Sequence, residues 1–277
     1  MLHRDLALSD GDRGGSPTLA DFDGDGFPEI AVSVSSDLIV TDLQDPSPAC
    51  PTWLDVSGPP TTNTTRVPPT ISCSTDTDCS SLDSDTVCNE ATSQCICLHN
   101  GWRQAIEDNG SRATASAAFD FDTDGSSEIV FQDECSLLFY QGLDGLVWFT
   151  EDSESRTRIE GPVIADVDFD LDAEVILAVN NDSGACSEAN TAVYNNGIEV
   201  WGGRGGWAEA RTSWNQQSFH ETNVTDDASI PVFESESWLA NNSYRAMPEP
   251  TFGSSICVAL LFLGGLARAC RSRSPNP

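Results

Sequence analysis

The chain has 277 residues, 39% of them hydrophobic, which is enough for a folded core and excludes disorder throughout. Its 44 acidic residues outnumber 13 basic ones, all arginine, and the net charge of −31 excludes nucleic acid as a partner. The carboxylate excess favours cation binding, and ten cysteines favour an exported, disulfide-bonded protein over a cytosolic one. Residues 1–12 contain no export signal, so we expect a start farther upstream or a fragment.

An acidic motif, Asp-x-Asp-x-Asp-Gly-x-x-Glu, first occurs at 21–29. It recurs at 120–128 and, with Leu171 in place of the glycine, at 166–174. The second and third copies begin 46 residues apart, whereas the first and second begin 99 residues apart. The larger spacing includes a Cys-rich segment, which we interpret as an insertion between neighbouring repeats.

Runs of β-branched and aromatic residues around each motif predict strands at 30–34, 38–41, 129–132, 137–140, 146–150, 175–179, 191–194 and 198–201. A four-stranded unit that repeats about every 40 to 50 residues is typical of a propeller blade. We therefore expect an all-β fold, a β-propeller or partial propeller of four-stranded blades with a disulfide-rich insertion. Four such units, together with the insertion and a C-terminal tail, would account for nearly the whole chain, and an arc of a longer propeller fits equally well.

The spacing of the acidic motif is suited to binding a hard cation. Carboxylates at positions 1, 3, 5 and 9 and a backbone carbonyl at position 7 would surround one centre, and a glycine at position 6 permits the sharp turn. Oxygen ligands in this number suit Ca²⁺ better than Mg²⁺ or zinc. The expected ligands are Asp21, Asp23, Asp25, Phe27 (carbonyl) and Glu29; Asp120, Asp122, Asp124, Ser126 (carbonyl) and Glu128; and Asp166, Asp168, Asp170, Asp172 (carbonyl) and Glu174.

In the third copy, a left-handed conformation at Leu171 would cost about 1–2 kcal/mol, so we expect a weaker or empty site there. The alternative for all three copies is a set of solvated acidic turns. These repeats resemble the FG-GAP or VCBS repeats of integrin-α-type β-propellers over residues 14–201. The resemblance implies a propeller fold, a calcium loop between the first two strands of each blade and an extracellular setting, but no particular ligand.

The Cys-rich segment at 50–98 contains six of the ten cysteines, namely Cys50 and five that follow it. Its Cys95-x-Cys97 pair resembles part of an EGF-like module, with Cys50 as a candidate sixth cysteine. A small disulfide knot is the broader expectation, and a zinc site is the alternative. Cys135 and Cys186 are expected to pair with each other.

The remaining segments lie after the third repeat. Residues 202–247 are rich in Trp and Asn and could stack on sugars or pack the last blade against the first. The tail combines Pro248-Glu249-Pro250, an apolar stretch at 251–267 and three arginines, and it resembles a PEP-CTERM sorting signal. That resemblance implies an exosortase-type processing enzyme and transient membrane contact, whereas a plain C-terminal anchor is the alternative. The expected units are 14–49, 50–98, 110–160, 161–201, 202–247 and 248–277.

No catalytic motif is evident, and the chain has three histidines. We expect an exported calcium-binding β-propeller surface protein with a structural, adhesive or exopolysaccharide-associated role. Its partner would be an extracellular polysaccharide or a surface protein. The alternative is a polysaccharide-acting lyase or hydrolase that uses a groove near Arg211 and His220.

Overall fold

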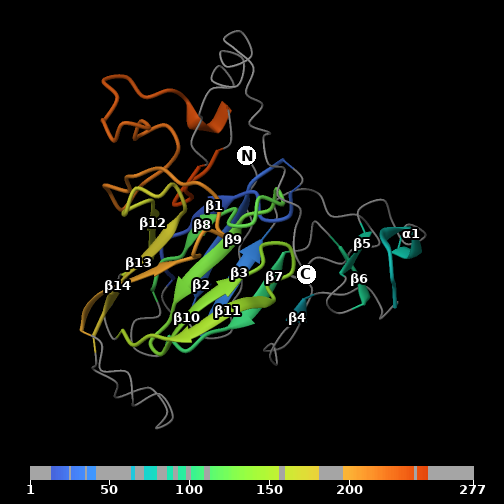
Figure 1. The fold of residues 1–277 in the computed structure, drawn as a ribbon. Coiled ribbons are helices and arrows are strands. Elements are labelled where there is room, and N and C mark those ends of the chain that lie inside the picture. Colours follow the sequence, from blue (N-terminus) through green and yellow to red (C-terminus); the bar gives the residue numbers. More distant parts are fainter. Residues whose placement is uncertain are drawn as a thin grey trace, which may run out of the picture.

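The chain is all-β, with antiparallel sheets and little helix (Figure 1). In this computed structural model the described residues are 14–24, 26–34, 36–41, 64–65, 72–79, 86–89, 93–97, 101–108, 113–155, 160–180, 196–239 and 242–248. The described residues include no helix that is long and apolar enough to cross a membrane. Except for Pro248, the predicted sorting tail lies outside the described residues.

Sheet 1 has the strand order β1-β2-β3-β7-β4. Its strands are β1 (Thr18–Ala20), β2 (Glu29–Val34), β3 (Asp37–Thr41), β7 (Trp102–Ala105) and β4 (Thr64–Thr65). Because β7 pairs with β3, the Cys-rich segment lies between two strands of one sheet. This corrects our expectation that the segment separates neighbouring repeats and that the first repeat ends at residue 49. Trp102 and Gln104 of β7 are buried and Arg103 is half-buried, a strand alternation too short to recognise in the sequence.

Sheets 2 and 3 repeat the pattern of sheet 1. Sheet 2 comprises β8 (Ala117–Phe119), β9 (Glu128–Gln132), β10 (Ser136–Tyr140) and β11 (Val147–Asp152). Sheet 3 comprises β12 (Val163–Ala165), β13 (Glu174–Val179) and β14 (Gly197–Gly202), all antiparallel. The strand predicted at 191–194 lies outside the described residues.

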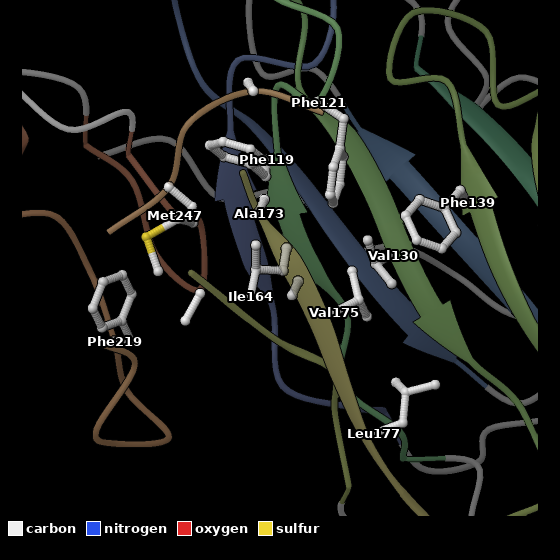
Figure 2. Packing of buried hydrophobic residues seen from close by; sticks show 14 of the residues in the cluster. Phe119, Phe121, Val130, Phe139, Ile164, Ala173, Val175, Leu177, Phe219 and Met247 are labelled. Atoms are coloured by element: carbon white, nitrogen blue, oxygen red, sulfur yellow. The ribbon is translucent and has the colours of Figure 1, made fainter. Parts of the chain in front are cut away.

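Two apolar layers hold the three sheets face to face. Since successive side chains of a strand point to opposite faces, Ile129 and Phe131 of β9 pack toward Leu38 and Val40 of sheet 1. Val130 lies in the other layer, which also contains Val175 and Leu177 of sheet 3 (Figure 2). Each large apolar side chain buried in this way contributes about 1.5–3 kcal/mol, so these layers are a principal source of stability.

The C-terminal segment packs across the inner strands. Leu19 and Tyr244 exchange two backbone hydrogen bonds, and Ala118 bonds to Arg245 and Met247. The buried Arg245 guanidinium donates to the carbonyl oxygens of Ser116, Gln217 and Pro162. Trp214 stacks on Phe219 at 4.6 Å between ring centroids and lies under Arg245. The arrangement of these residues agrees with a packing role for the Trp-rich segment.

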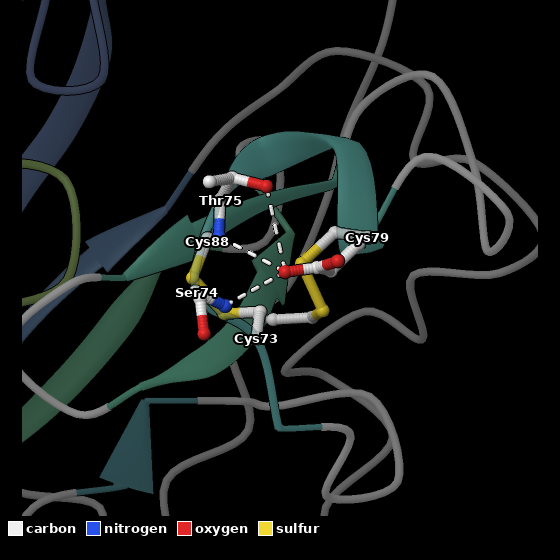
Figure 3. Close-up of a disulfide and its surroundings, with 7 residues drawn as sticks. Cys73, Ser74, Thr75, Cys79 and Cys88 are labelled. Carbon is white, nitrogen blue, oxygen red and sulfur yellow. Dashed lines mark hydrogen bonds between the residues drawn. A yellow bond between two sulfur atoms is a disulfide. The ribbon is translucent and has the colours of Figure 1, made fainter.

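The Cys-rich segment contains the hairpin of β5 (Thr86–Asn89) and β6 (Gln94–Cys97) and the short helix α1 (Asp76–Cys79). Disulfides join Cys73 to Cys88 and Cys79 to Cys95, so these four cysteines cannot form the zinc site considered above. The Asp78 carboxylate accepts hydrogen bonds from Ser74 and Thr75, which lower its pKa (Figure 3). Cys135 is also disulfide-bonded, whereas Cys50 and Cys186 lie outside the described residues.

Candidate metal centres

The three acidic loops occupy the same place in the three sheets. Each joins the first strand of its sheet to the second: β1 to β2, β8 to β9, and β12 to β13. The last residue of each motif, Glu29, Glu128 or Glu174, is also the first residue of the second strand. The sheet therefore fixes the backbone position of this glutamate.

In each loop the carboxylates at positions 1, 3 and 9 converge. One oxygen from each lies within 4.8 Å of the others, in the groups Asp21, Asp23 and Glu29; Asp120, Asp122 and Glu128; and Asp166, Asp168 and Glu174. Two oxygens that bind one Ca²⁺ at about 2.3–2.6 Å can be no farther apart than about 5 Å. The donor set and its spacing therefore fit one calcium ion in each loop.

The other predicted ligands are placed differently. Asp124 and Asp170, at position 5, accept hydrogen bonds from the backbone N–H groups of Ser126 (2.8 Å) and Asp172 (2.9 Å), both at position 7. Asp25 lies outside the described residues, and Phe27, at position 7 of the first loop, has an exposed side chain. Of the described carboxylates, those at positions 1, 3 and 9 form the compact group, and those at position 5 instead cap the turn.

Backbone hydrogen bonds shape all three loops in the same way. The position 9 glutamate accepts the N–H of position 2: Phe22 to Glu29 (2.6 Å), Phe121 to Glu128 (2.8 Å) and Val167 to Glu174 (2.9 Å). The position 1 aspartate accepts two further N–H groups from later in its loop. These bonds orient the carboxylates toward a common centre.

Positions 4 and 6 of every loop have a left-handed backbone. The φ angles are 78° at Gly24 and 90° at Gly26, 62° at Thr123 and 99° at Gly125, and 66° at Phe169 and 83° at Leu171. A residue with a Cβ atom is disfavoured in this conformation by about 1–2 kcal/mol. The first loop has glycine at both positions, the second at one and the third at neither, so strain increases from the first loop to the third. The sequence motif identified position 6 but not position 4.

The position 9 glutamates are buried: Glu29, Glu128 and Glu174 are 2%, 4% and 5% exposed. Burial, with a smaller contribution from the nearby Asp122 and Asp120 carboxylates, raises the pKa of Glu128 to about 8. Burial also raises the pKa values of Glu174, Asp120 and Asp122. A cation at the centre of the loop would favour the charged carboxylates and so oppose these shifts.

Neighbouring loops are connected through the backbone. The N–H of Ser127, in the second loop, donates to the carbonyl of Asp21 in the first (2.8 Å). Ala208 donates to Phe121 of the second loop (2.8 Å), and Ala210 donates to Leu171 of the third (3.1 Å). Residues 208–210 therefore link the second and third loops, a connection that the sequence did not predict.

The two side chains named for the enzyme alternative have intramolecular partners. The Arg211 guanidinium is buried, donates to the carbonyls of Glu221 and Val224 and forms an ion pair with Asp226 (2.6 Å). His220 is paired with the Glu234 carboxylate. Their contacts account for both side chains as parts of the C-terminal packing.

No protein-family model and no curated protein matches the chain. Among solved structures, the chain is similar to the V. cholerae biofilm matrix protein Bap1, with a TM-score of 0.53 and 21% sequence identity. The match covers 80% of this chain and 28% of the Bap1 chain. At this identity the similarity indicates a shared all-β, antiparallel fold.

Proposed function

We propose that the protein is an exported, calcium-binding surface protein with a structural or adhesive role. The observation that carries this proposal is the threefold repetition of one carboxylate group at the same strand junction, each with a buried glutamate. Charge and disulfides support an extracellular setting. The fold is shared with a protein described as a biofilm matrix component.

Calcium would act as a structural link in each loop. The carboxylates at positions 1, 3 and 9 are the ligands most directly supported by the geometry, because their oxygens already converge. The ion would join the end of the first strand to the start of the second, and it would compensate the buried charge of the glutamate. Removing calcium should therefore loosen the strand junctions rather than abolish a reaction.

We further propose that the sheets are blades of a β-propeller or of an arc of one. Sheets 2 and 3 stack on their predecessors through equivalent faces, and sheets 1 and 2 each contain at least four strands. The inner strands β1, β8 and β12 are neighbours, as blade-inner strands would be (Figure 1).

The partner we propose is an extracellular polysaccharide or another surface protein. Export would end with an exosortase-type enzyme acting at Pro248-Glu249-Pro250 while the apolar tail makes transient membrane contact.

Two measurements test the proposed function. Thermal melting of the full chain in 2 mM Ca²⁺, 2 mM Mg²⁺ or EDTA tests which cation binds. Calcium at ten times its Kd should raise the free energy of unfolding by about 1.4 kcal/mol per site, and Mg²⁺ should raise it less. Cosedimentation with purified exopolysaccharide in calcium tests the partner. Coincident melting curves in calcium and EDTA would contradict calcium binding, and absence of cosedimentation would leave a surface protein as the partner.

A further inference from the structure

The C-terminal segment, residues 244–247, lies between the two inner strands β1 and β8. Leu19 of β1 and Tyr244 exchange two backbone hydrogen bonds, of 2.8 and 2.9 Å. Ala118 of β8 makes two further backbone bonds to the same segment, of 3.0 and 2.9 Å. The segment therefore pairs with β1 on one side, in the antiparallel direction, and with β8 on the other, in the parallel direction.

Both strands that hold the C-terminal segment end at a candidate calcium loop. Leu19 lies two residues before Asp21, and Ala118 lies two residues before Asp120, the position 1 carboxylates of the first and second loops. Sheet 3 is joined to the segment through a side-chain hydrogen bond to the carbonyl of Pro162, which precedes β12. The third loop follows β12, so it lies at the other end of that strand. The segment is therefore connected most directly to the first two loops.

After this segment the chain enters a cavity between the same two loops. The cavity has a volume of about 250 Å³, and Asp21 of the first loop and Asp120 of the second are among the residues that line it. Pro248 lines it as well and is half-buried. The two residues before it, Ala246 and Met247, are 6% and 3% exposed. The Pro-Glu-Pro motif therefore begins where the chain is still held between the two loops.

Cutting beside Pro248 requires the C-terminal segment to leave β1 and β8. A protease binds the residues on both sides of the bond that it cuts as an extended strand, which a segment paired with other strands cannot supply. When opening is fast, the rate of cutting follows the fraction of molecules in which the segment is released. An ion that binds only the closed form lowers that fraction about tenfold when calcium is at ten times its Kd.

We propose, on the basis of the calcium sites inferred above, that calcium in the first two loops locks the C-terminal segment onto β1 and β8. The lock controls when the chain can be cut beside Pro248. Without calcium the segment is released more often and the chain is cut faster, whereas with both ions bound the segment stays paired. The cut of the tail would then precede calcium loading, and calcium would hold the shortened chain in its folded form.

Amide hydrogen exchange of the full chain, in millimolar calcium and in EDTA, tests the lock. The backbone N–H groups of Tyr244, Arg245 and Met247 donate hydrogen bonds that opening of the segment would break. Their exchange should be slower in calcium by about tenfold or more. The N–H of Ala228, which bonds to Thr225 within an exposed loop, is the control and should exchange at the same rate in both buffers. Equal exchange of the segment in both buffers, in a chain that binds calcium, would overturn the proposal.

Substitutions at position 3 of the three loops show which ions act on the segment. Asp23→Asn in the first loop and Asp122→Asn in the second should each reduce the effect of calcium on exchange of the segment, and together they should abolish it. Asp168→Asn makes the same change in the third loop, so it is the matched control and should leave the effect in place. Equal effects of Asp122→Asn and Asp168→Asn would contradict the assignment of the lock to the first two loops.

Limited proteolysis of the full chain tests the consequence for cutting. Trypsin cuts after arginine, and Arg245 is 3% exposed, so a cut at this residue reports release of the segment. The product that ends at Arg245 should form about tenfold or more slowly in calcium than in EDTA. An added arginine-containing peptide measures the activity of trypsin in each buffer. Calcium that binds in equilibrium dialysis but leaves this rate unchanged would overturn the lock alone, whereas absence of calcium binding would overturn the proposed calcium sites as well.

Discussion

Glu128 accepts a hydrogen bond from the backbone N–H of Phe121 at 2.8 Å, which ties the end of the second acidic loop to its start. The same bond joins Glu29 to Phe22 and Glu174 to Val167. Each loop is thus closed by its own backbone, and its buried glutamate is oriented without a cation. The electrostatic cost of the clustered carboxylates is what a cation would offset.

The first prediction concerns the pH dependence of the calcium-free protein. Glu128 has a folded-state pKa of about 8, above its ordinary value of 4.5. The protonated glutamate is therefore favoured by folding: its contribution is complete below about pH 4.5 and is lost as pH rises through 8. We expect the free energy of unfolding in EDTA to fall by a few kcal/mol over this range, at about 1.4 kcal/mol per pKa unit.

Denaturant unfolding of the parent and of Glu128→Gln, from pH 5 to 8.5, measures this effect. Because glutamine does not titrate, the variant's free energy of unfolding in EDTA should depend much less on pH. It should exceed that of the parent near pH 8.5. An unchanged slope in the variant would mean that Glu128 does not titrate in this range.

The second prediction concerns backbone strain in the third loop. Leu171 is held at φ 83°, where a Cβ atom is disfavoured. Leu171→Gly should stabilise the protein by up to about 1 kcal/mol, because relief of strain exceeds the added entropy of the unfolded glycine. Gly125→Ala, at φ 99° in the second loop, is the opposite change and should destabilise by a similar amount. Urea unfolding compares the two, and destabilisation by Leu171→Gly would contradict the assignment of strain.

The strands were largely predictable, because β-branched and aromatic runs such as 129–132 and 175–179 mark them directly. The fourth strand of sheet 1 was missed, since Trp102–Ala105 is short and follows a Cys-rich segment. The convergence of positions 1, 3 and 9 followed from spacing in the sequence. The left-handed position 4 did not, because glycine, threonine and phenylalanine share no local signature there. The link through residues 208–210 depends on long-range packing that no local pattern encodes.

The third prediction is that the Cys-rich insertion, including the two-residue edge strand β4, is dispensable for folding of the other strands of sheet 1. Val40 of β3 pairs with Trp102 of β7, so the strand ends that flank the insertion are adjacent. Deleting residues 52–98 and adding a short Gly-Ser bridge should leave a folded protein, because loop closure costs little. Near-ultraviolet circular dichroism and calcium-dependent melting report folding. A deletion variant without cooperative melting would show that the insertion stabilises sheet 1.

The fourth prediction concerns the tail after Met247. An apolar stretch of about seventeen residues with several Gly and Ser is short for a permanent anchor, which needs about twenty. We expect the exported protein to be cut near Pro248-Glu249-Pro250. Intact-mass measurement of surface-extracted protein checks this, with a Glu249→Ala variant as the comparison that should retain the tail. A mass that includes residues 251–277 in the parent would favour a plain anchor.

Equilibrium dialysis of calcium against the full chain counts the ions that the acidic loops bind. We expect at least two calcium ions to bind per chain with Kd of about 10⁻⁴ to 10⁻³ M, as in extracellular modules. Asp21→Ala and Asp120→Ala should each remove one ion, whereas Asp168→Ala should affect only the weakest site, in the strained third loop. The exposed Glu236→Gln, outside the loops, should leave binding unchanged. Calcium binding that is absent at millimolar concentration, or that is the same in the parent, Asp21→Ala and Asp120→Ala, would show that the acidic loops are not calcium sites.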